Sequence, residues 1–198
     1  MSEDGRLLEV LHALRVRGVA DPDQVAVRAG LTRPDATAVL LDAQAAGLAA
    51  RVPFAGPEDW SLTERGKAHG ERLLAAQLDA LGLRPMVEDV VDAFGPWNHL
   101  VVDACTRWQL ADLSVTRTRA TLPEVLRALD RAADGLASIE GRLSPQLPRF
   151  SGYHARFTAA VERARDDPSW VAAMDRDSAH RVWFEMHEDL LATLARAR

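Results

Sequence analysis

The chain has 198 residues, of which 47% are hydrophobic and 27% are charged, and its net charge at pH 7 is −5. This composition is typical of a globular protein and excludes a disordered or fibrous chain. The single cysteine, Cys105, excludes an intrachain disulfide and a metal cluster built from several cysteines. Lys67 is the only lysine beside 23 arginines, and together with abundant alanine this bias suggests a GC-rich genome.

Membrane insertion and secretion are not indicated by the sequence. It contains no apolar run close to the roughly 20 residues that cross a bilayer. The opening Met1-Ser2-Glu3-Asp4 is acidic, whereas a secretion signal begins with cationic residues. We therefore expect a soluble, cytoplasmic protein without membrane contact.

The first 47 residues predict three short helices. Leucine and valine recur at helical spacing over residues 6–16, and Gly18 ends that segment. Asp21-Pro22-Asp23-Gln24 then provides the cap of a second helix, which ends at Gly30. Thr32-Arg33-Pro34-Asp35 caps a third helix that runs to Gly47. Two short helices joined by a tight glycine-bearing turn are typical of a helix-turn-helix.

A β-hairpin is predicted after the third helix. Residues 48–52 favour a strand, the proline and glycine of residues 53–58 favour a turn, and residues 59–62 favour a returning strand. Thr63-Glu64-Arg65-Gly66 then caps a fourth helix, which reaches Leu81.

This segment resembles the winged-helix domains of bacterial transcription regulators of the MarR and PadR type. The resemblance rests on Ala46-Gly47-Leu48 and, about a dozen residues later, Trp60-Ser61-Leu62-Thr63-Glu64-Arg65-Gly66. It covers roughly residues 5–81. It implies a transcription regulator that binds DNA as a homodimer, with the third helix in the major groove and the hairpin wing against the backbone.

The resemblance also implies which residues contact DNA. Phosphate contacts are expected from Arg28, Arg33 and Arg51, and Thr37 and Gln44 are expected nearest the bases. Thr32 is a further candidate for contact with DNA. Helical spacing predicts that Ala36, Val39, Leu40 and Ala43 of the third helix face the core. Its outward residues are then Arg33, Asp35, Thr37, Ala38, Leu41, Asp42 and Gln44.

The charge of this segment does not favour DNA binding. Residues 1–80 contain nine Lys and Arg against twelve Asp and Glu, a net charge of −3, and the wing tip at residues 54–59 carries no cation. An alternative is therefore a protein-interaction module that regulates a partner enzyme, with Leu41 and Phe54 in an apolar contact patch. Similar winged-helix segments accompany phosphoenolpyruvate-utilising enzymes in GC-rich bacteria, which fits an accessory role.

The second half of the chain predicts an all-helical bundle, so that the fold class is mainly α, with domains at residues 1–81 and 82–198. The break at Gly82-Leu83-Arg84-Pro85 separates the two. Candidate helices in the second domain span residues 86–94, 97–112, 121–143, 153–166 and 176–196. The domain is expected to dimerise, to sense a small molecule, or both.

The last helix is predicted to be amphipathic. Its apolar stripe consists of Ala179, Trp183, Met186, Leu190 and Leu194, extended by Phe184 and Leu191. His180 and His187 fall inside this arc. The opposite, solvated face is expected to carry Arg181, Glu185, Glu188, Asp189 and Arg196.

Polar and aromatic residues of the bundle could enclose a small organic anion. The candidate ligand-binding residues are Trp97, Asn98, Trp108, Tyr153, Arg156, His180, Trp183 and His187. The simpler interpretation is that the aromatic side chains and the two histidines belong to the core.

No catalytic, metal or cofactor motif is found. His187-Glu188 resembles the start of His-Glu-x-x-His, but Leu191 stands where the second histidine is required. Phosphate-binding glycine loops and a nucleophile elbow are missing from the sequence. We expect Cys105 to be a core residue, and we expect neither enzyme activity nor a bound metal or cofactor.

Overall fold

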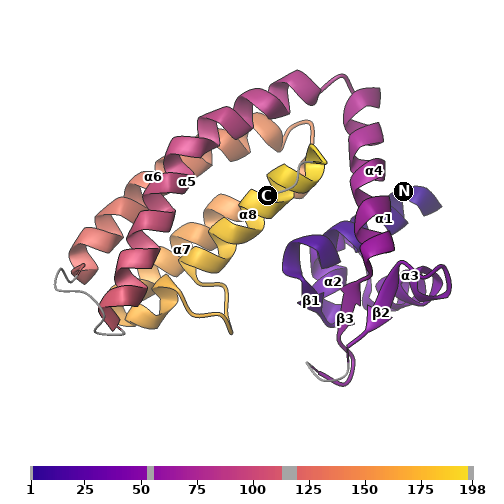
Figure 1. The fold of residues 1–198 in the computed structure, drawn as a ribbon, viewed down its shortest axis with the longest axis horizontal. Helices are drawn as coiled ribbons and strands as arrows, with labels where there is room; N and C mark the ends of the chain where they lie inside the picture. The colour runs from indigo at the N-terminus through magenta and orange to yellow at the C-terminus, as the bar shows by residue number, and fades with distance from the viewer. Residues whose placement is uncertain (1, 53–55, 113–119, 196–198) are drawn as a thin grey trace. The chain divides into compact units, whose positions relative to one another are not determined.

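The computed structural model describes residues 2–52, 56–112 and 120–195. These residues are mainly helical, with eight α-helices and one small three-stranded sheet (Figure 1). They form two compact units. The first runs to Pro85 and also takes the residues from Glu188 onward, and the second is Met86–His187. This division differs from the predicted boundary after residue 81, because the C-terminal segment belongs to the first unit.

The first unit has the element order α1, β1, α2, α3, β2, β3 and α4. The bounds are α1 Glu3–Arg17, β1 Val19–Ala20, α2 Pro22–Ala29, α3 Arg33–Ala45, β2 Ala49–Arg51, β3 Trp60–Leu62 and α4 Glu64–Ala80. The predicted helices and the predicted pair of strands are confirmed in this region. The short strand β1 was not predicted.

Capping residues explain where these helices begin. Ser2, Asp21, Thr32 and Thr63 each accept a hydrogen bond from a backbone N–H in the first turn of their helix. Gly30 ends α2 in the left-handed conformation (φ 64°). Only three residues, Gly30, Leu31 and Thr32, separate α2 from α3. The turn between α2 and α3 is therefore tight and fixed at both ends.

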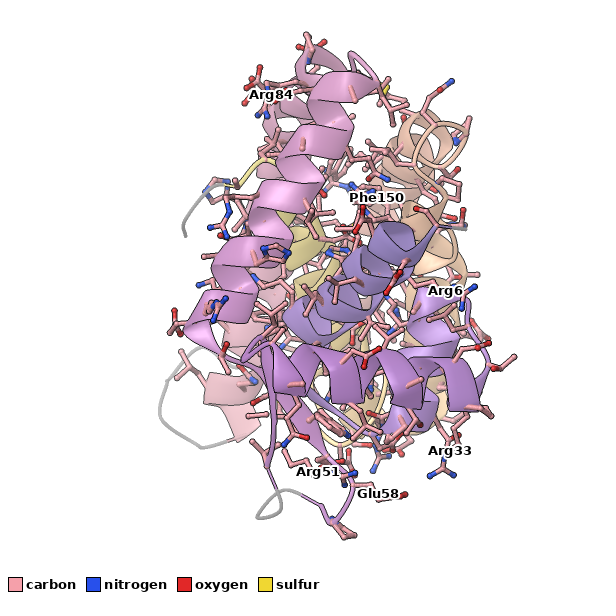
Figure 2. The ribbon with its side chains drawn as sticks, turned by 90° about the vertical axis from the view of Figure 1, so that its right-hand side faces the viewer. Arg6, Arg33, Arg51, Glu58, Arg84 and Phe150 are labelled. Carbon is pink, nitrogen blue, oxygen red and sulfur yellow. The ribbon has the colours of Figure 1, made fainter. Side chains whose placement is uncertain are left out.

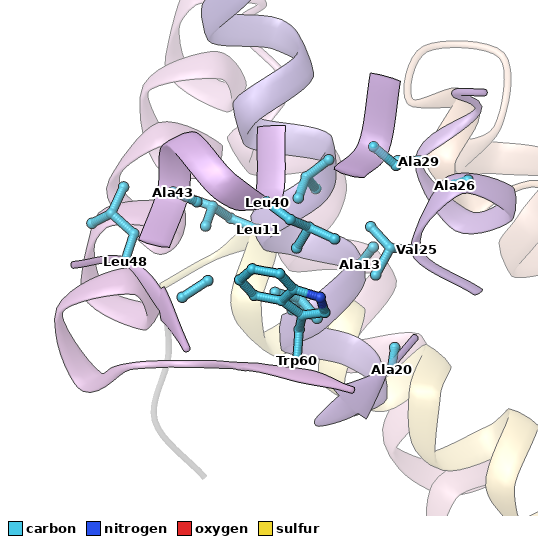
Figure 3. Packing of buried hydrophobic residues seen from close by; sticks show 14 residues of the cluster. Leu11, Ala13, Ala20, Val25, Ala26, Ala29, Leu40, Ala43, Leu48 and Trp60 are labelled. Atoms are coloured by element: carbon cyan, nitrogen blue, oxygen red, sulfur yellow. The ribbon is translucent and has the colours of Figure 1, made fainter. Parts of the chain in front are cut away.

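The sheet is antiparallel and has the order β1-β3-β2. Trp60 pairs with Arg51 on one side and Ala20 on the other. Trp60 is fully buried at the centre of the hydrophobic core, beside Leu11 and Leu40 (Figure 3). Gly66 at the start of α4 lies against the carbonyl of Leu48, and a Cβ at this position would meet that oxygen at 1.8 Å. The hairpin and α4 thus pack in a way that only glycine permits.

The second unit contains α6, α7, two 3₁₀ turns, nearly all of α5 and the part of α8 that ends at His187. The bounds are α5 Arg84–Asp112, α6 Leu122–Leu143, η1 Pro148–Phe150, α7 Tyr153–Asp166, η2 Pro168–Val171 and α8 Ala179–Thr193. The predictions for α6 and α7 agree to within a residue. Helices α6 and α7 pack closely against each other.

The predicted break at Gly95-Pro96 is wrong, because α5 continues through it. A proline inside a helix removes one backbone hydrogen bond and costs about 3 kcal/mol. Phe94 and Val101 are buried on either side of the proline. The helix is therefore anchored by packing on both sides of the proline.

The predicted solvated face of α8 is also wrong. Glu185, Glu188 and Asp189 are 1%, 5% and 0% exposed, whereas Phe184, predicted to be inward, is 42% exposed. Arg181 of the predicted face is half-buried, and Arg196 lies outside the described residues. Helix α8 is divided between the units after His187. Within the described residues, none of the helices combines the length and hydropathy needed to cross a bilayer.

Candidate functional site

Helix α3 exposes most of its surface. Ala36, Leu40 and Ala43 are buried in the core and Val39 is half-buried, as predicted. Thr37 is half-buried, and the other predicted outward residues are exposed: Arg33, Asp35, Ala38, Leu41, Asp42 and Gln44. The helix is thus positioned by one apolar side and leaves the rest accessible to a partner.

Arg33 lies at the start of α3 on the side of α2 and the wing (Figure 2). It donates to the Glu58 carboxylate at 2.8 Å, and its other terminal nitrogen is 3.4 Å from Asp23. All three side chains are about half exposed or more. Exposed ion pairs contribute little, roughly 0–1 kcal/mol, so an incoming phosphate can compete for Arg33.

The three uncharged side chains predicted to contact DNA, Thr32, Thr37 and Gln44, differ in whether other groups of α3 engage them. Thr32 caps α3, and its hydroxyl donates to the Asp35 carboxylate at 2.7 Å. The Thr37 hydroxyl donates to the backbone carbonyl of Arg33 at 2.9 Å. Gln44 is exposed near the end of the helix. Among these three, Gln44 has the side chain best placed to reach another molecule.

Arg51 lies on β2, at the base of the wing. Its side chain is exposed, and its guanidinium carbon is 4.7 Å from the centre of the buried Trp60 ring. A cation over an aromatic face is held in place without being neutralised. Arg51 therefore presents a positive charge at the base of the wing, and its predicted contact with a phosphate stays a prediction. Phe54 of the predicted apolar patch lies outside the described residues.

Arg28 differs from its predicted role. Its guanidinium donates to the Asp189 carboxylate at 2.8 Å, and its side chain is only 13% exposed. On the same carboxylate, Asp189 Oδ1 lies 2.9 Å from His12 Nε2. Arg28 thus binds the C-terminal part of α8 within the first unit. Its guanidinium is engaged there, so Arg28 is not proposed to contact DNA.

Arg15 forms a second contact of the same kind. It donates to Glu188 at 2.5 Å and to Glu71 of α4 at 3.3 Å. The network of Arg15, Arg28, His12 and the two α8 carboxylates was not predicted from the sequence. The available signal was His12, a lone histidine on the apolar side of α1.

A groove of about 490 Å³ runs between α1 and the opposite side of α3. Its rim carries Glu3, Asp4, Asp35 and Asp42, with Arg6 as the single cation among its lining residues. Its floor is formed by Leu7, Ala38, Val39, Ala43, Ala46 and Leu48. Arg6 lies 3.9 Å from Asp35, so even this cation is partly neutralised. The groove is therefore apolar at the bottom and acidic at the edge.

In the second unit, the predicted ligand-binding aromatics pack against one another. Trp183 is 1% exposed and stacks on Phe94 with ring centres 4.9 Å apart, and Phe157 lies at 5.3 Å. The Trp183 indole donates to Asn98 at 3.1 Å. Tyr153 is fully buried, and its hydroxyl donates to the backbone carbonyl of Glu185 at 3.4 Å. These side chains fill the space that the prediction assigned to a ligand.

The other predicted ligand-binding residues are dispersed. His187 is half-buried, with its ring 5.5 Å from Phe94. Trp97 lies against Gly135 of α6, where a Cβ would approach its ring to 2.5 Å. Trp108 instead lines a separate hollow of about 280 Å³ with Gln109, Ser169, Ala172 and Ala173.

Arg156 does not offer a free charge to an organic anion. It donates to Asp177 at 2.9 Å and to the buried Glu185 at 2.7 Å. Burial alone would lower the pKa of Arg156, but the hydrogen bonds and charges of these two carboxylates outweigh it and raise that pKa. The guanidinium is thus the counter-ion of a buried glutamate, which the sequence analysis had placed in solvent.

Two further groups have shifted ionisation. Burial lowers the pKa of the half-buried His180, which favours the neutral imidazole. Burial raises the pKa of the Cys105 thiol to about 12, so it stays protonated and unreactive at neutral pH. Within the described ranges, no three His, Cys, Asp or Glu side chains form a group that could hold a metal ion.

Comparison of the chain with protein-family models, with curated proteins and with solved structures gave no match in any of the three.

Proposed function

We propose that the first unit is a winged helix-turn-helix and that the protein is a DNA-binding transcription regulator. The order of elements supports this: two helices joined by a tight turn, then an antiparallel hairpin, with α3 exposed. In the proposal α3 enters the major groove and the β2-β3 wing contacts the backbone. The helical second unit serves to dimerise the protein, which would present two α3 helices to a two-fold operator.

The distribution of charge around α3 carries the proposal. At roughly 100° per residue, Thr37 and Gln44 lie roughly 40° and 20° from Arg33, on the side of the wing and of Arg51. Asp35 and Asp42 lie roughly 200° and 180° away, on the groove side. The two aspartates of α3 thus lie away from the side of the helix that carries Arg33 and Gln44, where Glu58 and Asp23 pair with Arg33.

The decisive experiment measures binding of the full chain to the DNA upstream of its own gene across a salt series. Arg33→Ala should weaken the complex about fivefold or more and reduce the salt slope by about 1. Arg6→Ala is the matched control, because Arg6 has the same charge and a similar exposed fraction, 47% against 48%, on the groove side. It should change affinity less than about twofold. Equal losses in both variants, or no sequence preference at low salt, would contradict the proposal.

The exposed Leu41 favours a second candidate, a winged helix that binds a protein. Leu41 is 48% exposed in the middle of α3, where a DNA-reading helix commonly carries polar residues. If the chain does not bind DNA at any salt concentration, the protein-binding winged helix remains as the alternative. The protein would then be an accessory subunit of another enzyme.

A further inference from the structure

We propose that the groove between α1 and α3 is a docking site for a basic amphipathic helix of a partner protein. Such a helix would carry aliphatic residues on one side and arginine or lysine residues flanking them. The site differs from the proposed DNA-contacting side of α3, so this inference stands whether or not the protein binds DNA.

The rim of the groove specifies the charge of the occupant. The carboxylates of Glu3, Asp4, Asp35 and Asp42 outnumber the one lining cation by four to one, and all four residues are exposed. Phosphate groups would be repelled by this rim, so the groove excludes nucleic acid as its occupant. A cationic partner would be attracted and oriented by the same charges.

The end of α3 adds to the negative potential. Ala46, the C-cap of α3, lines the groove, and the last turn of the helix contains no basic residue. A helix C-terminus carries a partial negative charge that a nearby cation stabilises by roughly 0.3–1 kcal/mol. Arg65 of α4 comes near Gly47, directly after this end of the helix, so the end of α3 adds only a small part to the charge of the rim.

The floor of the groove specifies the shape of the occupant. Ala38 and Ala46 are small and exposed, so another backbone can approach α3 closely, while Leu7, Val39 and Leu48 provide apolar contact. Helix α3 has 13 residues and is therefore roughly 20 Å long, which matches a partner helix of about three to four turns. An amphipathic helix laid in an apolar groove is a common mode of peptide recognition.

The test uses the full chain and a fluorescein-labelled synthetic helix of 14 residues with leucine on one side and arginine flanking it. A scrambled peptide of identical composition is the peptide control. Fluorescence anisotropy should show saturable binding of the amphipathic peptide and at least about fivefold weaker binding of the scrambled one. Saturable binding that depends on peptide order supports a groove, whereas equal binding of the two peptides reports charge alone and overturns the proposal.

Two variants test the charge of the rim and the shape of the floor separately. Asp42→Arg should weaken binding of the peptide about tenfold, because it reverses a charge of the rim. Asp92→Arg makes the same charge change at an exposed position that does not line the groove, and it should weaken binding less than about twofold. Ala38→Gln should weaken binding at least about threefold without any change of charge, because the longer side chain would occupy part of the groove. Circular dichroism checks that each variant is folded. Binding that is lost equally in Asp42→Arg and Asp92→Arg, or is unaffected by Ala38→Gln, overturns the proposal.

Discussion

Helices α3 and α8 carry similar numbers of charged residues, yet their charges have opposite environments. Asp35 and Asp42 of α3 are exposed, whereas Glu188 and Asp189 of α8 are 5% and 0% exposed. The α8 carboxylates are buried because arginines of α1 and α2 reach them. A carboxylate is therefore buried at low cost only where a mostly buried cation of a neighbouring element pairs with it, as Arg15 and Arg28 do on α8, whereas the Arg6–Asp35 pair of α1 and α3 stays in solvent.

The largest effect is expected from breaking the α8 network. Asp189→Ala leaves the mostly buried Arg28 without the carboxylate it contacts at 2.8 Å and removes the group beside His12. Loss of one partner of a buried ion pair costs about 3–5 kcal/mol. The free energy of unfolding of the full chain in urea measures this.

The matched change on α3 is Asp42→Ala, an exposed aspartate on a helix. It should alter the free energy of unfolding by less than about 0.5 kcal/mol. If the two variants lose similar stability, then the α8 carboxylates are not a buried, paired cluster and the contrast between the helices fails.

The same contrast explains what the sequence could predict. Helix starts followed from local chemistry: Asp21, Thr32 and Thr63 each cap the helix that their position predicted. The burial of Leu40 followed from helical spacing. These inferences succeeded because each depends on residues only a few positions apart.

The prediction failed where distant residues decide the environment. Asp189 and Arg28 are 161 positions apart, and Arg156 and Glu185 are 29 apart. Periodicity places the carboxylates of α8 on one side but contains no information about what faces that side. The predicted ligand pocket failed for the same reason, because Phe94 of α5 fills the space beside Trp183.

An intermediate effect is expected at the start of α3. Thr32→Ala removes the side chain that accepts from the Asp35 backbone N–H at 3.3 Å. Loss of such a cap costs about 1 kcal/mol. Thr37→Ala is the control within the same helix. The Thr37 hydroxyl only donates to the Arg33 carbonyl, which already accepts a backbone hydrogen bond within α3. Urea unfolding should rank Asp189→Ala above Thr32→Ala, and Thr32→Ala above Thr37→Ala. A Thr32→Ala protein as stable as Thr37→Ala would show that capping does not position α3.

The smallest effect concerns His180, the neutral base of α8. Its Nδ1 is buried without a hydrogen-bond partner among the described residues, and burial lowers its pKa below the ordinary value of 6.5. The unfolded chain therefore binds a proton at this site more readily than the folded chain does. The stability that the neutral form provides is present above pH 6.5 and is lost as the pH falls through that value. Unfolding in urea at pH 7.5 and 5.5 should show a smaller loss of stability in acid for His180→Gln than for the parent protein. Because every other titratable group is common to the two proteins, an equal loss would mean that the His180 imidazole is solvated in the folded chain.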